Sequence, residues 1–328
     1  MNTIRSILLG AAVLLGLYLV FVLGPAIGSF FTVFGRRKVT PLYQLDMTHG
    51  YLTPYREELL TAADRLEAVP HTEVRMTAAD GAVLAADWYD RGSSVTVIMV
   101  HGFSADKLTN FAVQADLLVR DGYNVLLPEN RAHARSGGKR STMGICEQYD
   151  VLAWTEYASG TLGSRQIVLY GMSMGCTAVS YASDKLDPDK VRALVLDCGY
   201  TSPWEQMRDD MRKWHVPNLL LMPHLRLLGR LVLKTDIRTP VTDSLERCRI
   251  PALFIHGTDD HSVLFERGQT NYRSCASEKQ ALFVEGADHT VSCLRGGDTA
   301  LRTLMTFIDR NTERGTDHNA SNASNEKL

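Results

Sequence analysis

The sequence contains few cysteines and has no excess of charge of either sign. Its 328 residues include six cysteines, too few for a small fold held together by disulfides. Lysine plus arginine number 35 and aspartate plus glutamate 37, so the net charge is −2. This balance lacks the basic excess that binds nucleic acid and the acidic excess of a solvating tail. We therefore expect no nucleic-acid partner.

Charge is also absent locally, since no charged residue occurs between Arg5 and Arg36. Residues 7–23 are almost entirely aliphatic, and a second apolar stretch, 26–34, follows a Gly-Pro pair. A helix of about 20 apolar residues crosses the hydrocarbon core of a bilayer. We therefore predict that residues 1–38 form a single-pass N-terminal membrane anchor. A cleaved signal peptide and a buried core helix are the alternatives, and the length of the apolar run argues against both.

The charges that flank this segment bear on its orientation. Three basic residues, 36–38, follow the segment, and Arg5 with the α-amine precedes it. The positive-inside rule then favours a cytoplasmic location for the rest of the chain. The difference between the two flanks is small, so the side of the membrane stays open.

Beyond the anchor, predicted strands and helices alternate along the chain. We predict that residues 39–70 form a connector that contains a helix at 54–68. Residues 73–77 and 83–89 are predicted to form a pair of strands around an Asp-Gly turn. Further strands are predicted at 95–100, 123–127, 166–170, 191–197, 252–256 and 280–284, and helices at 110–120, 147–159, 174–186, 265–273 and 298–311. This alternation predicts an α/β domain over 71–311, a mostly parallel sheet of about eight strands flanked by helices. In such a sheet the reactive site lies at the carboxyl ends of the strands.

Two stretches depart from the alternation. Residues 200–245 are rich in leucine, methionine and tryptophan with basic residues between them, and they are too long for an ordinary loop. We predict an inserted helical cap there. Residues 312–328 are polar, and we predict a disordered tail.

The strongest local motif is Gly-Met-Ser-Met-Gly at 171–175, between a predicted strand and a predicted helix. A serine hydroxyl is a poor nucleophile at neutral pH unless a base activates it and a sharp turn exposes it. Glycines two residues before and after Ser173 permit that tight turn. Ser173 is therefore our candidate nucleophile.

Partners for Ser173 are expected later in the chain, an acid and then a histidine. The segment after the predicted strand at 252–256 offers Asp259 and Asp260, and Asp197 at another strand end is an alternative acid. His289 follows the last predicted strand, where the imidazole would carry the proton of Ser173.

An oxyanion hole needs two backbone N–H groups directed at the developing negative charge. One is expected from Met174, directly after the nucleophile, and the other from Phe103, which follows a His-Gly pair at the end of the strand at 95–100. Because backbone groups donate, the turn matters more here than the side chains.

Together these motifs resemble the α/β-hydrolase superfamily over residues 70–312. The matching motifs, in the family's order, are His-Gly-Phe at 101–103, Gly-x-Ser-x-Gly at 171–175, His-Gly-x-x-Asp-x-x-Val at 256–263 and Gly-Ala-x-His at 286–289. This spacing places the family's acid on Asp260 rather than Asp259. The loop at 130–138 resembles the family's Arg-Gly-His-Gly-x-Ser loop, but Ala132 and Ala134 stand where glycine is often found. We therefore expect the backbone of this loop to differ slightly.

With the anchor, the chain is similar to bacterial membrane-anchored hydrolases of the serine-aminopeptidase-like and esterase-like groups. The resemblance implies hydrolysis through an acyl-enzyme with Ser173, Asp260 and His289 as the triad, but it does not identify the substrate. We predict that the bond cleaved is a carboxylic ester or thioester and that no metal or organic cofactor takes part. A serine peptidase or aminopeptidase using the same triad is the alternative. A non-catalytic, membrane-tethered binding module is the hypothesis from a different class.

The apolar content of the cap bears on the substrate. We predict that Trp204, Met207 and Trp214 bind an acyl or aromatic group of a small, lipophilic substrate. A cap that only packs its own core would have the same composition.

Overall fold

The computed structural model describes residues 2–46 and 50–313, and the chain divides into two compact units. The sheet unit consists of Arg36–Thr201 and Pro240–Leu328, and the helical unit of Met1–Gly35 and Ser202–Thr239. Most of the tail predicted at 312–328 lies outside the described residues. Each unit is described by itself below.

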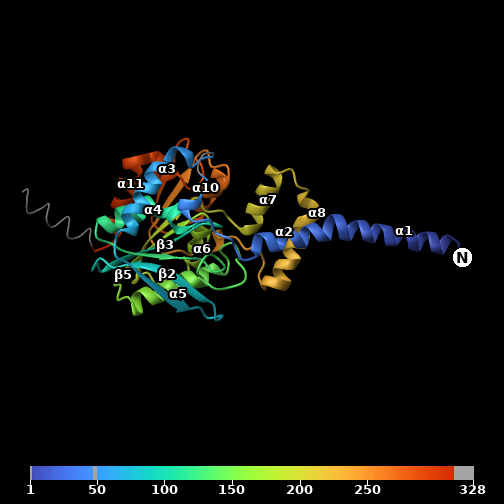
Figure 1. The fold of residues 1–328 in the computed structure, drawn as a ribbon, viewed down its shortest axis with the longest axis horizontal. Helices are drawn as coiled ribbons and strands as arrows, with labels where there is room; N and C mark the ends of the chain where they lie inside the picture. The colour runs from blue at the N-terminus through green and yellow to red at the C-terminus, as the bar shows by residue number, and fades with distance from the viewer. Residues whose placement is uncertain (1, 47–49, 314–328) are drawn as a thin grey trace, which may run out of the picture. The chain divides into compact units, whose positions relative to one another are not determined.

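The sheet unit contains the eight-stranded, mostly parallel sheet that the sequence predicts (Figure 1). The strand order is β1-β2-β4-β3-β5-β6-β7-β8, with β1 and β2 antiparallel to their neighbours and the remaining strands parallel. The strands are β1 (Thr72–Thr77), β2 (Val83–Tyr89), β3 (Val95–Val100), β4 (Asn124–Pro128), β5 (Gln166–Met172), β6 (Val191–Asp197), β7 (Ala252–Gly257) and β8 (Lys279–Val284). This is the α/β-hydrolase fold that the sequence predicts.

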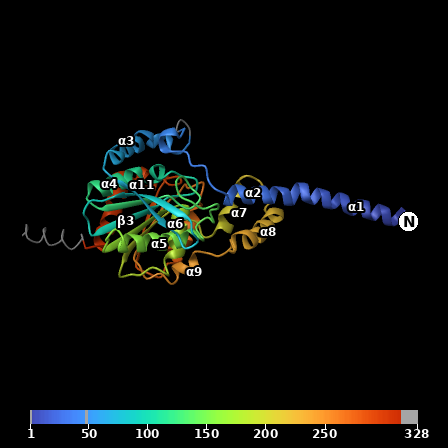
Figure 2. The same ribbon diagram turned by 60° about the horizontal axis from the view of Figure 1, so that its bottom comes forward.

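Helices cover both faces of the sheet, and each face has its own apolar core (Figure 2). One core joins the strands to α3, α4 and α11, and the other joins them to α5, α6 and α9. The helices are α3 (Arg56–Glu67), α4 (Lys107–Arg120), α5 (Glu147–Gly160), α6 (Met174–Ala182), α9 (Thr242–Leu245), α10 (Phe265–Ser274) and α11 (Ser292–Asn311). Every residue of β3 is buried, because this strand of β-branched and other apolar residues has helices on both faces.

The predicted elements are confirmed, and most differences lie at their ends. The helix α11 begins at Ser292, six residues before the predicted start at 298. Gly297 interrupts it with φ 52° and ψ −143°, so two helical segments meet at a kink there. The apolar periodicity of the sequence restarts after that glycine, which is why the pattern detects only the second segment.

The N-terminal part of the helical unit is one long helical segment, formed by α1 (Asn2–Tyr18), a π-helical turn (Leu19–Leu23) and α2 (Gly24–Phe34). The π-helical turn precedes Pro25, which has no N–H to donate, and the N–H of Gly24 bonds back to the carbonyl of Leu19. Within the described residues, Thr3–Phe34 is the one helix long and apolar enough to cross a membrane, with mean hydropathy 2.6 over its best window. An N-terminal signal sequence can also meet this criterion of length and hydropathy.

The cap part of this unit consists of α7 (Pro203–Lys213), α8 (Asn218–Leu228) and a π-helical turn (Gly229–Leu233). The hydroxyl of Ser202 accepts the N–H of Glu205 at 3.1 Å and so caps the start of α7. The compact part of the cap, 202–239, is shorter than the predicted 200–245, because α9 belongs to the sheet unit.

Candidate active site

Three side chains meet at the carboxyl ends of the parallel strands. Ser173 directly follows β5, Asp260 lies three residues after β7, and His289 lies in the loop after β8. The Nε2 atom of His289 is 3.0 Å from Oγ of Ser173, and its Nδ1 atom is 2.8 Å from Oδ2 of Asp260. The structure thus joins the three predicted triad residues into one hydrogen-bonded chain, although Ser173 and His289 are 116 positions apart in the sequence.

Ser173 occupies a strained position between β5 and α6. Its φ is 55° and its ψ −116°, a region that L-residues rarely adopt. Glycine is needed on both sides of this turn, because at positions 171 and 175 there is no room for a side chain. A Cβ on Gly175 would lie 1.9 Å from the carbonyl oxygen of Val100, and one on Gly171 would lie 2.5 Å from that of Gly175. The close packing of strand against helix therefore requires glycine at both places.

Asp260 is held as a carboxylate with every oxygen engaged. Its Oδ1 accepts the N–H groups of Ser262 at 2.8 Å and Val263 at 2.7 Å, while Oδ2 faces Nδ1 of His289. Burial alone would raise the pKa of this carboxyl, but the imidazoles of His289 and His256 hold it well below its usual range. The neighbouring Asp259 is exposed. Of the two aspartates that the sequence offers, the structure brings Asp260 to His289.

His256, which the sequence pattern places at the end of β7, lies beside this acid without contacting Ser173. It is buried, and its Nε2 donates to the carbonyl of Val263 at 2.9 Å and lies 3.4 Å from Oδ2 of Asp260. The ring therefore supports the loop that carries the acid.

Two further residues, at the end of β6 and directly after it, lie close to the triad without joining it. Asp197 is fully buried, its Oδ2 accepts the hydroxyl of Tyr170 at 3.1 Å, and its Oδ1 has no hydrogen-bond partner. Burial raises the pKa of this carboxyl to about 6. The alternative acid of the sequence analysis is thus bonded to a tyrosine rather than to His289.

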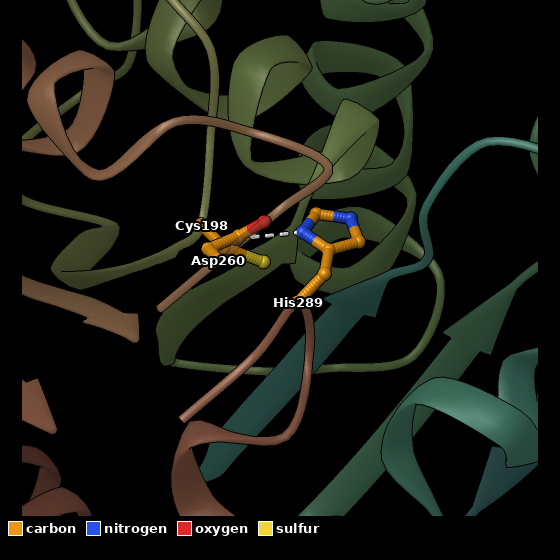
Figure 3. A group of neighbouring side chains, drawn as sticks. All are labelled: Cys198, Asp260 and His289. Carbon is orange, nitrogen blue, oxygen red and sulfur yellow. Dashed lines mark hydrogen bonds and ion pairs between the residues drawn. The ribbon is translucent and has the colours of Figure 1, made fainter. Parts of the chain in front are cut away.

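The second of these neighbours is Cys198, whose side chain lies beside Asp260 and His289 (Figure 3). One ligand atom from each of the three residues falls within 4.8 Å of the others, a spacing that a metal ion could use. Asp260 and His289 are already hydrogen-bonded to each other, and burial raises the pKa of the Cys198 thiol well above its usual value. Because His289 is already hydrogen-bonded to both Asp260 and Ser173, this geometry suits a proton relay.

The predicted oxyanion side is built around the end of β3. His101 is buried, donates from Nδ1 to the carbonyl of Gly102 at 2.8 Å and accepts the N–H of Asn130 on Nε2 at 3.0 Å. Burial lowers the pKa of His101 to about 3, which keeps the ring neutral for both roles. The N–H of Gly102 donates a hydrogen bond to Oδ1 of Asn110 at 2.7 Å. That leaves the N–H of Phe103, the next residue, as the candidate donor.

Gly102 also lies directly against the nucleophile, since a Cβ added to it would be 3.2 Å from the Cβ of Ser173. The second candidate donor, the N–H of Met174, belongs to the first turn of α6, where N–H groups have no acceptor within the helix. The two predicted oxyanion donors thus come from segments adjoining Ser173. Their role in catalysis remains a prediction.

The loop at 130–138 contains alanine where the family often has glycine. Ala132 has φ 58° and Ala134 φ 35°, both in the left-handed region that glycine favours. The loop presents the carbonyls of Ala132, Ala134, Ser136 and Gly138 to a single neighbouring segment. The alanines therefore adopt a glycine-type backbone at a cost in strain.

That neighbouring segment is the basic pair after the anchor, which the sequence analysis interpreted only as a membrane flank. Arg36 donates to the carbonyls of Ala134 at 2.6 Å and Ser136 at 2.9 Å. Arg37 donates from its backbone N–H to Ala132 at 2.8 Å and from Nε to the hydroxyl of Ser104 at 2.7 Å. No local pattern distinguishes an arginine that docks on a loop from one that faces headgroups.

Arg37 also stacks on the ring of Phe103, with its guanidinium carbon 4.1 Å from the ring centroid. His133 supports the same turn, because its Nε2 accepts the N–H of Ser104 at 3.2 Å. Arg37 and His133 are therefore positioning residues for the turn that carries the candidate oxyanion donor.

The predicted substrate-binding residues belong to the helical unit. Trp204 and Met207 lie on α7, and Trp214 follows it. Met207 is buried, Trp204 lies under the guanidinium of Arg238 at 5.7 Å, and Trp214 is 72% exposed. The structure does not bring these three side chains together into one pocket, and substrate binding by them remains a prediction.

Comparison with known proteins agrees with the fold. A family model described as "alpha/beta hydrolase fold" matches residues 95–217. An uncharacterised protein of Bacillus subtilis, YqkD, is 27% identical over 65% of this chain and 71% of its own length. The human protein ABHD12B is 24% identical over 68% of this chain and 64% of its own length. The chain thus spans about two thirds of the length of these relatives.

Solved structures resemble the sheet unit's architecture. The esterase Pf2001 of Pyrococcus furiosus superposes with a TM-score of 0.61 at 22% identity, covering 75% of this chain and 94% of that chain. An esterase from Exiguobacterium antarcticum superposes with a TM-score of 0.55 at 18% identity, covering 72% and 98%. At such identities the likeness concerns the fold. The eight-stranded sheet and the family-model match over residues 95–217 show that this chain has the α/β-hydrolase fold.

Proposed function

We propose that this protein is a membrane-anchored serine hydrolase that cleaves a carboxylic ester or thioester through an acyl-enzyme. The observation that carries the proposal is the hydrogen-bonded chain from Oγ of Ser173 through His289 to Asp260, with Ser173 on a strained turn. A serine hydroxyl activated by an imidazole, itself oriented by a buried carboxylate, is suited to attack on an acyl carbon.

In the first half of the reaction, Oγ of Ser173 bonds to the carbonyl carbon while Nε2 of His289 takes its proton. The N–H groups of Phe103 and Met174 stabilise the oxyanion that forms. The bond to the leaving alcohol or thiol then breaks, and His289 gives that group its proton.

In the second half, His289 removes a proton from water as the water attacks the acyl-enzyme. The bond between the acyl carbon and Ser173 breaks, the acid is released and Ser173 regains its proton. Asp260, whose pKa is held low, remains ionised throughout and stabilises the imidazolium.

The preference for esters over amides is supported by the solved structures that resemble this chain, two of which are esterases. Both lie below 25% identity and the fold hosts many reactions, so the substrate class must be measured. A panel of ester, thioester and aminoacyl-amide substrates would measure it. Faster turnover of the aminoacyl amides would indicate a peptidase instead.

Reaction with a fluorophosphonate probe tests the nucleophile directly. Oγ of Ser173 displaces fluoride from phosphorus, so we expect the wild-type protein to be labelled and Ser173→Ala to remain unlabelled at equal concentration. A wild type that takes up no probe while remaining folded would refute the enzyme proposal and favour a binding module.

We further propose that Thr3–Phe34 anchors the protein, in agreement with its length and hydropathy. Full-length protein should stay with the membrane pellet during alkaline carbonate extraction. Release into the supernatant would exclude an integral anchor, and an N-terminus found beyond the helix in the mature protein would identify a signal peptide.

A further inference from the structure

The cap carries a row of apolar side chains on its surface. The helix α8 and the π-helical turn after it expose Leu219, Leu220, Leu227 and Leu231, which we call the leucine face. Leu219 is 83% exposed and Leu231 68%. The same helix buries Leu221, Met222 and Leu225 on its other side. A helix that is apolar on both sides needs a second apolar environment besides its own core.

Basic residues outnumber acidic ones around the leucine face, although Arg212 is paired with Asp209 at 3.5 Å. Between residues 211 and 235 the sequence contains no acidic residue and has the basic residues Arg212, Lys213, Arg226, Arg230 and Lys234. Arg226 and Arg230 share the carboxylate of Asp236, at 2.9 Å and 2.6 Å, so only one of their two charges is compensated. Exposed leucines edged by excess positive charge are typical of helices that lie in the interface of an anionic bilayer.

The leucine face is fixed beside the anchor helix within the helical unit. The helix α8 packs against α2 and the π-helical turn that precedes it, and the hydroxyl of Tyr18 bonds to Nε2 of His224 at 2.6 Å. The stripe formed by Ala26, Phe30 and Phe34 on α2 is fully buried. Where the anchor enters the membrane, α8 must therefore lie close to the same surface.

The length of the helical segment sets the depth. Residues Thr3–Leu23 contain no buried side chain, and at 1.5 Å per residue they extend about 31 Å, enough for the hydrocarbon core. Residues Gly24–Phe34 add about 16 Å beyond it, so the first part of α2 crosses a headgroup layer about 5–8 Å thick and the rest extends past it. The helix α8 packs against α2 and against the last turn before it, Leu19–Leu23, so it lies at the end of the spanning part and beside the headgroup layer.

A second copy of the chain is a poorer occupant of this face. A symmetric dimer would bring the same patch together from both copies, and each copy would add its own uncompensated positive charges to the contact. Anionic headgroups would instead attract the excess of basic residues to the bilayer surface.

We propose that the leucine face docks into the interfacial layer of a bilayer that contains anionic lipid, beside the anchor helix. The cap is then a second, peripheral membrane contact of the same molecule. This inference rests on the proposed anchor and is independent of the proposed reaction.

A fluorescent probe at Leu219 tests the docking. Full-length Leu219→Cys, labelled with bimane, is reconstituted into vesicles of phosphatidylcholine and phosphatidylglycerol at 7:3. Leu264→Cys is the matched control, a leucine 42% exposed on the sheet unit, and unmodified protein gives the background from the native cysteines, of which Cys146 alone is not buried. We expect doxyl-labelled lipid to quench the Leu219 probe at least threefold more than the Leu264 probe, and aqueous iodide to do the reverse.

Equal access of iodide to both probes would overturn the proposal, because the face would then lie in water. A Leu219 probe shielded from both quenchers would also overturn it and would indicate that protein covers the face. Replacing Arg212 and Lys213 by glutamine in the Leu219→Cys protein should reduce lipid quenching at least twofold, and no reduction would refute the role of anionic lipid. Fluorophosphonate labelling is read separately, so failure of the reaction proposal would leave this result intact.

Discussion

The two units of this protein place their apolar side chains in opposite ways. In the sheet unit large apolar residues fill the two cores, and its exposed exceptions are Tyr43, Tyr51, Val83, Tyr149 and Leu264. In the helical unit many of them are exposed along α1, α2 and α8, in addition to those that form its small core. The first arrangement is typical of a surface that faces water, and the second agrees with the proposed contact with a bilayer.

The charges divide in the same way. The helical unit contains eight basic residues and four acidic ones, which leaves 27 basic and 33 acidic residues in the sheet unit. A net charge near zero for the whole chain therefore combines a basic unit with an acidic one. The difference shows that average composition conceals two surfaces suited to different surroundings.

The largest effect is expected at Asp260, the buried acid of the sheet unit, because the proposed reaction depends on it. Asp260→Asn would favour the wrong imidazole tautomer and remove the charge that stabilises the imidazolium, so we expect kcat/KM for a soluble ester to fall by about 10³-fold or more. Asp259→Asn, at the exposed neighbour, should change kcat/KM less than about threefold. Equal losses in the two variants would contradict the assignment of the acid.

The segment that joins the two units offers a second test. Arg37→Ala removes the hydrogen bond to Ser104 and the stacking on Phe103, so the turn with the candidate oxyanion donor should loosen. We expect kcat to fall about tenfold with little change in KM, as for a group that acts on the transition state. Lys38→Ala, an exposed neighbour, is the control. Similar kinetics in both variants would show that the basic pair only flanks the membrane.

The next prediction concerns Asp197, whose burial beside the active site should lower the free energy of unfolding of the protein. Its pKa is raised to about 6 from an ordinary value near 3.8, so the folded protein resists an ionisation that the unfolded chain undergoes readily. This carboxyl therefore lowers the free energy of unfolding as pH rises from about 4 to 6, by about 3 kcal/mol in all.

Asp197→Asn cannot ionise. Its stability relative to wild type should be near zero at pH 4 and rise towards that figure at pH 7, measured by denaturant unfolding at each pH. Activity should be largely retained, because Asp197 does not bond to His289. A stability difference that does not change with pH would disprove the shifted pKa, and a loss of activity like that of Asp260→Asn would restore Asp197 as the acid.

The smallest effect is expected in the loop that Arg36 and Arg37 contact. Ala132→Gly relieves a left-handed backbone but gives the unfolded chain more freedom, so the free energy of unfolding should rise by about 0.5 kcal/mol. Ala182→Gly, in the regular helix α6, is the matched control and should be destabilising by about 1 kcal/mol or more. A stability loss at Ala132 as large as the one at Ala182 would contradict the strain argument.

The sequence predicts the fold well because its signals are local. Continuous β-branched runs such as β3, the turn glycines at 171 and 175, and the long uncharged N-terminal segment each specify their own conformation. Motif order also predicts which residues meet, since the strand ends of a parallel sheet share one edge. The distance between Ser173 and His289 follows from topology.

The remaining features depend on contacts between distant residues, which no local pattern encodes. Arg36 and Arg37 contact a loop about 100 positions away, and His133 supports a turn 29 positions before it. The packing of α8 against α2 joins segments almost 200 residues apart. The composition of α2 and α8 shows that both helices are apolar. Which side of each helix is buried depends on how the two helices pack against each other.

The π-helical turn at Leu19–Leu23 changes the direction in which the side chains after it point around the helix axis. Its extra residue rotates every side chain after Gly24 by about 100° relative to an uninterrupted α-helix, the angle that one residue occupies. The direction in which the stripe of Ala26, Phe30 and Phe34 points is therefore shifted relative to the side chains of α1. Removing one residue from this turn would restore an uninterrupted α-helix. The stripe would keep all its residues but would be rotated away from α8.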